Sequence, residues 1–156
     1  FYIWIRFEWQ FSLGAVIALI HDVIITVGIF SFLAYEINLS IVAAVLTIVG
    51  YSMNDTVVIF DRVRENLKKY SKISISEISD LSTNQTLSRT LITSVTTLLA
   101  LFSIYIFGGA ILKGFSFAMI IGVIVGTYSS IFVATPILNY TNVNQKTILK
   151  KDKENN

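Results

Sequence analysis

Charged side chains interrupt the long apolar stretches of this 156-residue chain at only a few positions, and these suggest proton chemistry. Asp55 follows Asn54 near the end of one apolar stretch, and Arg89 opens the next. An ionised carboxylate in a bilayer costs at least about 2.5–3.5 kcal/mol, so it usually faces a partner, water or a proton route. Arg keeps its charge and has a planar fork that suits a carboxylate. We expect Asp55 to pair with Arg89 when ionised and to release it when protonated.

Both residues also have simpler structural explanations, which the sequence leaves open. Asp55 can form a static ion pair or a hydrogen bond between helices, without gaining or losing a proton. Arg89 can be an ordinary anchor at the membrane interface.

Five further polar residues are candidates for supporting roles, and the first is Asn54, directly before Asp55. His21 and Asp22 lie near the middle of an earlier apolar stretch, where they can relay a proton or simply satisfy each other. Thr93 and Thr97 follow Arg89 at four-residue spacing, so the three share one helix face. Inward hydroxyls there can hold water, but they can equally join helices.

Composition indicates an integral membrane protein. Hydrophobic residues make up 54% of the chain and charged residues 14%, against about 45–50% and about 25% in soluble domains. The chain has no Cys, which excludes disulfides and thiolate sites, and its single His argues against a zinc or iron site. A net charge of +2 is too small to suggest nucleic acid as a partner. We find no phosphate loop or nucleophile–base pair, and expect neither an enzyme nor a bound cofactor or metal.

The apolar stretches predict an all-α, polytopic membrane helical bundle over residues 1–140. A helix needs about 20 apolar residues to cross a bilayer. We expect four complete spans at 11–34, 39–60, 89–107 and 115–138, and the end of a truncated fifth span at 1–5. We expect a cytoplasmic helical loop at 61–88 and a disordered cytoplasmic tail at 141–156. We expect the second part of the loop, 76–88, to be an amphipathic helix on the membrane surface. The chain is interpreted as the C-terminal fragment of a longer protein.

Basic residues predict the orientation of these spans. Lys and Arg gather on the cytoplasmic side of short loops. With the spans above, Lys113 is the only one of the twelve Lys and Arg that falls on the other side. We therefore expect residues 61–88 and the C-terminus to be cytoplasmic. In the last span, Gly122 and Gly126 form a small-xxx-small pattern that favours close helix packing.

Several motifs resemble one family of membrane proteins. The run GYSMNDTVVIFDRVREN at 50–66 is similar to the signature of the SecF family, whose members act in protein export together with SecD. The stretches RFEW at 6–9, ALIHDV at 18–23 and NQTLSRT at 84–90 agree with it. The resemblance covers about residues 1–140.

The resemblance implies a function in the resistance-nodulation-division superfamily. Such proteins lie in the bacterial plasma membrane with SecD, beside the SecYEG channel. They use the proton gradient to help export preproteins, so protons are the coupling ion and lipids surround the bundle. The family implicates the positions of Asp55 and Arg89 in proton conduction. Its full-length members carry a further helix and an extracytoplasmic domain before the part present here.

Two other functions remain open from the sequence. One is a proton-coupled exporter of small molecules from the same superfamily, although its two large external domains are not expected with loops this short. The other is a purely structural membrane subunit, in which Asp55 and Arg89 can be replaced together by neutral residues.

Overall fold

The computed structural model describes residues 9–36, 38–70, 73–141 and 143, and it is built from helices. Four helical stretches are long and apolar enough to cross a membrane: α2 (Trp9–Phe32), α3 (Leu39–Lys69), α4 (Ile75–Phe107) and the stretch Gly109–Tyr140. The fourth consists of α5 (Gly109–Ser129), a π-helical segment η1 (Ser130–Ala134) and α6 (Thr135–Tyr140). The predicted all-helical class with four spans is confirmed. The truncated span at 1–5 and most of the expected tail at 141–156 lie outside the described residues.

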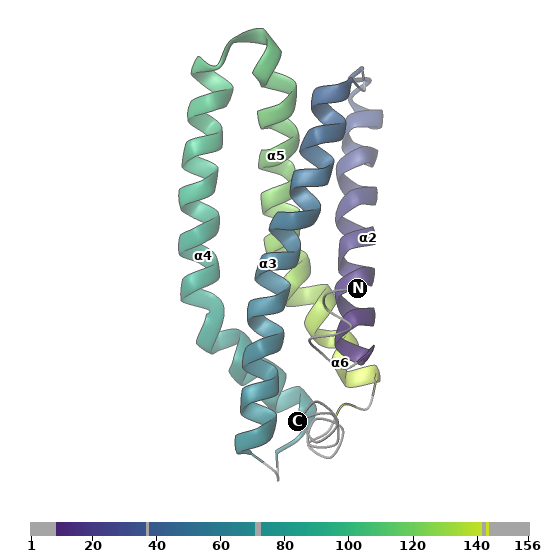
Figure 1. Cartoon of the computed structure of the whole chain (residues 1–156), viewed down its shortest axis with the longest axis vertical. Helices are drawn as coiled ribbons and strands as arrows, with labels where there is room; N and C mark the ends of the chain where they lie inside the picture. The colour runs from purple at the N-terminus through teal and green to yellow at the C-terminus, as the bar shows by residue number, and fades with distance from the viewer. Residues whose placement is uncertain (1–8, 37, 71–72, 142, 144–156) are drawn as a thin grey trace, which may run out of the picture.

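The four long helices form two hairpins that pack side by side (Figure 1). α2 and α3 are connected at the upper end, and so are α4 and α5. α3 and α5 pack on each other in the middle of the bundle, with α2 and α4 on opposite sides.

Local capping explains where two of the helices begin. The side chain of Asn38 accepts a hydrogen bond from the Ile41 amide at 3.1 Å, which caps α3. At the start of α4, Ser74 and Glu77 form a capping box in which each side chain bonds the other residue's backbone amide. Gly109 has a φ of +75°, a conformation that other residues rarely adopt, and it reverses the chain between α4 and α5.

The crossing of α3 and α5 depends on two glycines. A Cβ added at Gly122 would lie 2.2 Å from Ile48, and one at Gly126 would lie 3.1 Å from the Cβ of Ser52. At neither glycine is there room for a side chain between α5 and α3. The predicted packing role of this small-xxx-small pattern is therefore confirmed.

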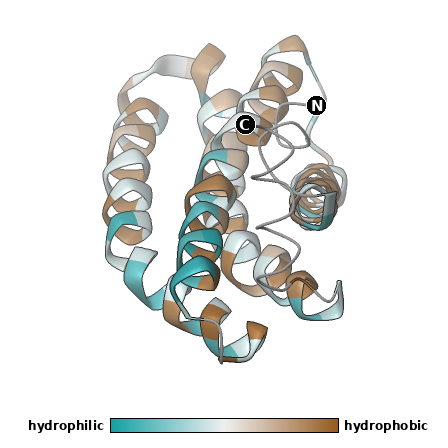
Figure 2. Cartoon of the chain, turned by 60° about the horizontal axis from the view of Figure 1, so that its bottom comes forward, coloured by the Kyte–Doolittle hydropathy of each residue, from teal (hydrophilic) through white to brown (hydrophobic). Residues whose placement is uncertain are grey.

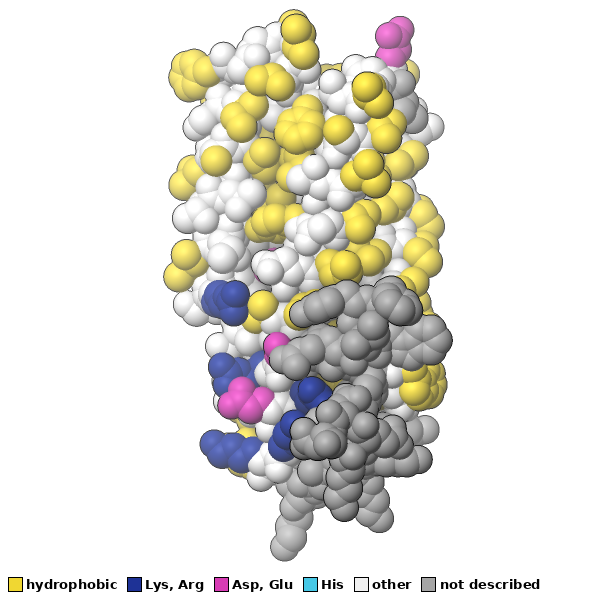
Figure 3. Space-filling model, in the orientation of Figure 1, with side chains coloured by type: hydrophobic (Ala, Val, Ile, Leu, Met, Phe, Trp, Pro, Cys, Tyr) yellow, Lys and Arg dark blue, Asp and Glu magenta, His cyan; other side chains and the backbone are white. Residues whose placement is uncertain are grey.

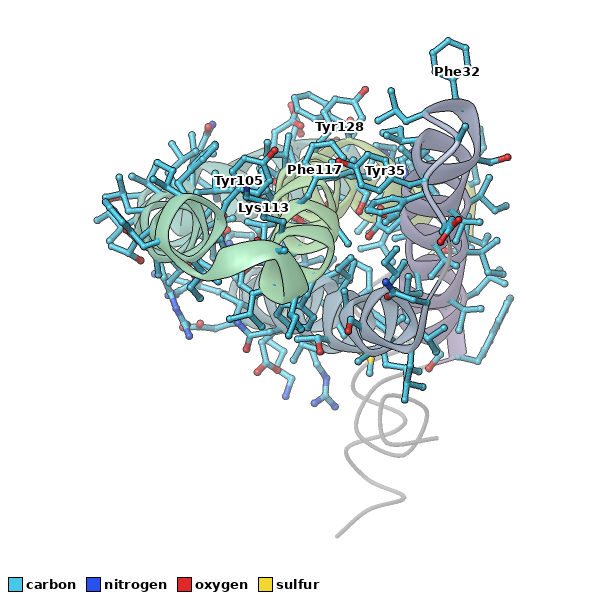
Figure 4. The ribbon with its side chains drawn as sticks, turned by 90° about the horizontal axis from the view of Figure 1, so that it is seen from above. Phe32, Tyr35, Tyr105, Lys113, Phe117 and Tyr128 are labelled. Atoms are coloured by element: carbon cyan, nitrogen blue, oxygen red, sulfur yellow. The ribbon has the colours of Figure 1, made fainter. Side chains whose placement is uncertain are left out.

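Aromatic rings tie the two hairpins together at the upper end. Viewed from above, Tyr35 lies against Phe117, and Tyr105 approaches the same ring (Figure 4). Tyr35 and Phe117 are stacked with ring centroids 5.7 Å apart, and Tyr105 is 6.2 Å from Phe117. Phe32 points away from the bundle. The rings join the α2–α3 connection to α4 and α5.

The segment predicted as an amphipathic helix, 76–88, is helical, and its place on the membrane surface stays a prediction. These residues are the first part of α4, which runs without interruption from Ile75 to Phe107 and contains neither Gly nor Pro. Ile78 is fully buried. The side-chain amide of Asn66 on α3 donates to Ser82 at 2.8 Å and to Gln85 at 3.0 Å. This segment therefore packs against the end of α3.

Polar and apolar residues separate along the long axis of the molecule. Hydrophilic residues gather towards the lower ends of α3 and α4 (Figure 2). Basic side chains lie in the lower half, whereas hydrophobic side chains cover the upper part of the visible face (Figure 3). This distribution fits helices that cross a bilayer.

Candidate functional site

Asp55 lies on the buried face of α3, within the stretch that is apolar enough to cross the membrane. It is 4% exposed, and its neighbours Ser52 and Thr56 are each 1% exposed. Its Oδ2 atom is buried and has no hydrogen-bond partner. An unpaired buried acceptor costs about 1–3 kcal/mol, so this arrangement is unfavourable for a purely structural carboxylate.

Arg89 lies on α4, exposed at the surface, and is close enough to Asp55 to interact with it electrostatically. No salt bridge joins them: within the described part of the chain, ion pairs link Arg62 to Glu65 at 2.9 Å and His21 to Asp22 at 3.1 Å. The structure thus brings the two predicted residues into one region and leaves them unbonded. Their proton-linked pairing stays a prediction.

Asp22 is the best-connected carboxylate of the described bundle. It is 1% exposed, and its Oδ2 accepts hydrogen bonds from Ser52 on α3 and from Ser129 on α5, the latter at 2.8 Å. Its Oδ1 lies 3.1 Å from Nδ1 of His21. Three helices therefore meet at this side chain. We call Asp22, Ser52 and Ser129 the Asp22 node.

Two predicted supporting residues lie at the edge of the site. The side chain of His21 is 30% exposed and contacts Asp22 on the same helix. Asn54 is exposed, although its neighbour Asp55 is buried. Adjacent residues on a helix point about 100° apart, because 3.6 residues make one turn. The functional roles of both residues stay predictions.

Hydroxyl groups line the buried face of α4, but they are not the ones expected. Thr93 and Thr97 are only partly buried, and the Thr93 hydroxyl donates to carbonyls of its own helix, those of Arg89 and Thr90. The buried hydroxyls lie on the neighbouring face and belong to Ser79, Ser82, Thr86, Thr90 and Ser94. The last four are spaced four residues apart, which is the signal that the sequence offered for them. Whether Thr93 and Thr97 support proton transfer stays a prediction.

One of these hydroxyls connects α4 to both central helices. Ser94 lies 2.7 Å from the hydroxyl of Thr127 on α5, and it accepts a longer hydrogen bond, of 3.5 Å, from Tyr51 on α3. Tyr51 directly precedes Ser52 of the Asp22 node. Polar contacts therefore extend across the bundle from α2 to α4.

These groups fit proton transfer better than other chemistry. The site offers carboxylates, hydroxyls and one imidazole, all of which exchange or relay protons. Among the residues that the structure describes, no group of three His, Cys, Asp or Glu could hold a metal ion. The asymmetry between Asp22, which has several donors, and Asp55, whose Oδ2 has none, is the main feature of the site.

Comparison with known proteins gives a consistent answer. The family described as "Protein export membrane protein SecD/SecF, C-terminal" matches residues 1–144. The protein translocase subunit SecF of Rhodobacter capsulatus is 59% identical over 138 residues, and that of Rickettsia rickettsii is 58% identical over 137 residues. Each alignment covers 88% of this chain, but only 41% and 44% of the respective relative. The chain thus spans less than half the length of these curated relatives.

Solved structures share the same fold. A crystal structure of SecDF in a super-membrane-facing form superimposes with a TM-score of 0.87 at 41% identity, over 97% of this chain and 21% of that one. The crystal structure of SecDF from Thermus thermophilus, described as a translocon-associated membrane protein, gives a TM-score of 0.86 at 43% identity. That superposition covers 91% of this chain and 20% of the other.

Proposed function

Because this chain belongs to the SecD/SecF family of protein export membrane proteins, we propose that it forms the membrane part of a proton-driven translocase subunit. In this proposal it works with SecD beside the SecYEG channel, and its substrates are exported preproteins. The relatives named SecF and the solved SecDF structures support this assignment. It performs no covalent chemistry, and the proton is its coupling ion.

The observation that carries the proton role is the environment of Asp55. Its Oδ2 is buried without a partner, and Arg89 is close enough to respond to its charge. An ionised Asp55 attracts the guanidinium, whereas a protonated Asp55 releases it. Arg89 is exposed and has a long side chain, so it can follow this change without unpacking the core.

Transfer of protons down the membrane potential supplies energy on the required scale. One charge that crosses 100 mV provides about 2.3 kcal/mol. This is several times the average value of about 0.6 kcal/mol for one hydrogen bond between membrane helices. One proton can therefore shift helices that are joined by a few such bonds, as α4 is joined to α3 and α5 through Ser94.

The test is to replace Asp55 by Asn in the full-length protein. This substitution keeps the shape of the side chain and removes its ability to carry a proton. We expect the gradient-dependent part of preprotein export in cells to be lost. Asp80→Asn is the matched control, because Asp80 is exposed near the start of α4 and loses the same charge.

Undiminished export in the Asp55→Asn cells, at normal protein abundance, would overturn the proton role. Loss of export in the Asp80→Asn cells as well would show that the assay responds to any lost charge. Arg89→Gln should reproduce the defect of Asp55→Asn.

We further propose that the bundle lies in the bacterial plasma membrane with its C-terminus in the cytoplasm. Lys and Arg side chains in the lower half of the described bundle support this orientation (Figure 3). A reporter enzyme that is active only in the cytoplasm, fused after Asn156, should be active. An inactive fusion would reverse the orientation.

A further inference from the structure

The Asp22 node contains a second buried carboxylate in the same bundle, and its hydrogen bonding differs from that of Asp55. Both serine hydroxyls donate to Oδ2 of Asp22, so this oxygen acts as an acceptor of two hydrogen bonds. Hydroxyl groups from two helices therefore hold this one oxygen in place. Asp55 has the opposite arrangement, because its Oδ2 is buried and unpaired.

Ser52 connects these two carboxylates. It donates to Asp22 across the α2–α3 contact, and it lies three residues before Asp55 on the same helix. Residues three apart on a helix are neighbours on one face. Both Ser52 and Asp55 are buried, so no bulk water separates them.

The two carboxylates also differ in depth. α3 begins at the upper, non-cytoplasmic end, and Ser52 precedes Asp55 by three residues, or about 4.5 Å of helical rise. Asp22 is hydrogen-bonded to Ser52 and lies at the level of that residue. A proton that enters from the upper side therefore reaches the Asp22 node before Asp55.

We propose that Asp22 is a second proton-carrying carboxylate, on the outer side of Asp55, and that Ser52 passes the proton from one to the other. This inference rests on the proposed function, since it assigns the step that precedes protonation of Asp55. Asp22 is the proton donor, and the Ser52 hydroxyl transfers the proton to Asp55.

The transfer conserves protons and charge. When Asp22 is protonated, its O–H donates to the Ser52 oxygen. Oδ2 of Asp55 has no partner in the observed structure, so the ionised Asp55 side chain must first rotate toward Ser52 and accept from its hydroxyl. Asp22 then gives its proton to Ser52 as Ser52 gives its own to Asp55. The products are an ionised Asp22, a neutral Ser52 and a protonated Asp55. The Ser52 hydroxyl then turns back to donate to Asp22, as in the observed structure.

Few other titratable groups face Asp22 from the helices that pack around it. α2 contributes His21, and α3 contributes Asp55, one turn beyond Ser52. α5 contributes only the neutral Ser129 at this point, and η1 has no titratable side chain. In α6, Tyr140 is exposed, at the far end of the helix. His21, with Nδ1 at 3.1 Å from Oδ1, is therefore the titratable side chain in contact with Asp22.

A purely structural role for Asp22 makes a different prediction. A static helix connector needs only an acceptor for two hydroxyls, and an Asn side-chain oxygen can fill that role in almost the same space. If Asp22 is only structural, loss of the Ser52 hydroxyl and loss of the Ser129 hydroxyl should have similar effects, since both donate to the same oxygen. A relay depends on Ser52 far more, because only Ser52 neighbours Asp55 on α3.

The decisive experiment compares Ser52→Ala with Ser129→Ala in the full-length protein. Each variant removes one small, buried hydroxyl and one hydrogen bond to Asp22. We expect Ser52→Ala to lower gradient-dependent export about tenfold or more, as loss of a proton-transfer group does. Ser129→Ala should lower export several-fold less than Ser52→Ala does, because Ser129 donates to Asp22 but does not neighbour Asp55 on α3. Equal effects of the two variants, of whatever size, would overturn the relay.

A second measurement does not depend on transport. Infrared difference spectra between two pH values report the carboxyl groups that gain a proton. We expect the full-length protein in membranes to show a carboxyl band that disappears in Asp22→Asn and a second that disappears in Asp55→Asn. If Asp22→Asn accumulates normally and loses no band, Asp22 stays ionised and the proposal fails. If the Asp22→Asn protein does not accumulate in cells, the comparison of Ser52→Ala with Ser129→Ala tests the proposal instead.

Asp55→Asn, measured in the same export assay, separates this inference from the proposed function. Normal export in Asp55→Asn would contradict both the proposed function and the proposed relay. Loss of export in Asp55→Asn, combined with normal export in Asp22→Asn and Ser52→Ala, would remove only the relay.

Discussion

Asp22 and Asp55 are both almost completely buried, at 1% and 4% exposure, yet the bundle surrounds them differently. Asp22 receives hydroxyl groups from α3 and α5 and an imidazole from its own helix. Asp55 has a buried oxygen with no partner, and its nearby cation, Arg89, lies at the surface of α4. One carboxylate joins helices, while the other is left with an unsatisfied bonding requirement.

The difference extends to the helices that carry these groups. α2, α3 and α5 meet at the Asp22 node, and the glycines of α5 bring its backbone against α3. Of the four candidate spans, α4 buries the smallest share of its apolar window. Arg89 lies on α4, so we infer that α4 is the helix that shifts when Asp55 changes its charge, with α2, α3 and α5 as the rigid part. This shift must occur against the extensive packing of α4 on α5.

The largest expected effect comes from placing Leu at each carboxylate in turn. Asp22→Leu removes the acceptor of the buried Ser52 hydroxyl and leaves Ser129 with only its 3.2 Å bond to the Gly126 carbonyl, so it should lower the free energy of unfolding by about 3 kcal/mol. Asp55→Leu removes a buried oxygen that has no partner, so it should leave that free energy unchanged or raise it by up to about 3 kcal/mol. Thermal unfolding of the full-length protein in detergent measures both. Similar losses would contradict the contrast between the two sites.

A smaller effect is expected from the glycine beside the Asp22 node. In Gly126→Ala the new methyl group meets the Cβ of Ser52 at 3.1 Å, so the helices must separate slightly. We expect a cost of about 1–3 kcal/mol in the same unfolding measurement.

Gly50→Ala on α3 is the control, because a Cβ there has no neighbour within 4 Å. Its better helix propensity should stabilise the protein by up to about 1 kcal/mol. If Gly126→Ala were as stable as Gly50→Ala, the tight α3–α5 crossing would not exist in solution.

The smallest effect should come from the polar contact that holds α4. Ser94→Ala removes the 2.7 Å contact with Thr127 and should cost about 0.6 kcal/mol, the average for such bonds between membrane helices. The control is Ser103→Ala on the same helix, because Ser103 is exposed and donates to its own helix at Leu99. A loss of several kcal/mol in Ser94→Ala would show that α4 belongs to the rigid part.

Local and periodic features were predictable from the sequence. The four spans follow from apolar length, and the packing of Gly122 and Gly126 follows from their spacing. The interruption by Asp55 marked a site residue because a carboxylate in an apolar stretch is conspicuous against its neighbours. By contrast, the sequence predicted a helix at 76–88 but not its hydrogen bonds to Asn66, because these depend on how α3 and α4 pack.

The sequence by itself determined that this chain is a bundle of apolar helices, with a carboxylate and a guanidinium at similar depths in the membrane. Length, hydropathy and charge act locally along the chain, and they suffice for that conclusion. Only the tertiary structure decided that Asp22 bonds Ser52, 30 positions away, and Ser129, 107 positions away, while Asp55 Oδ2 bonds nothing. These contacts depend on the rotation of each helix about its own axis. That rotation is fixed only when α2, α3 and α5 pack together.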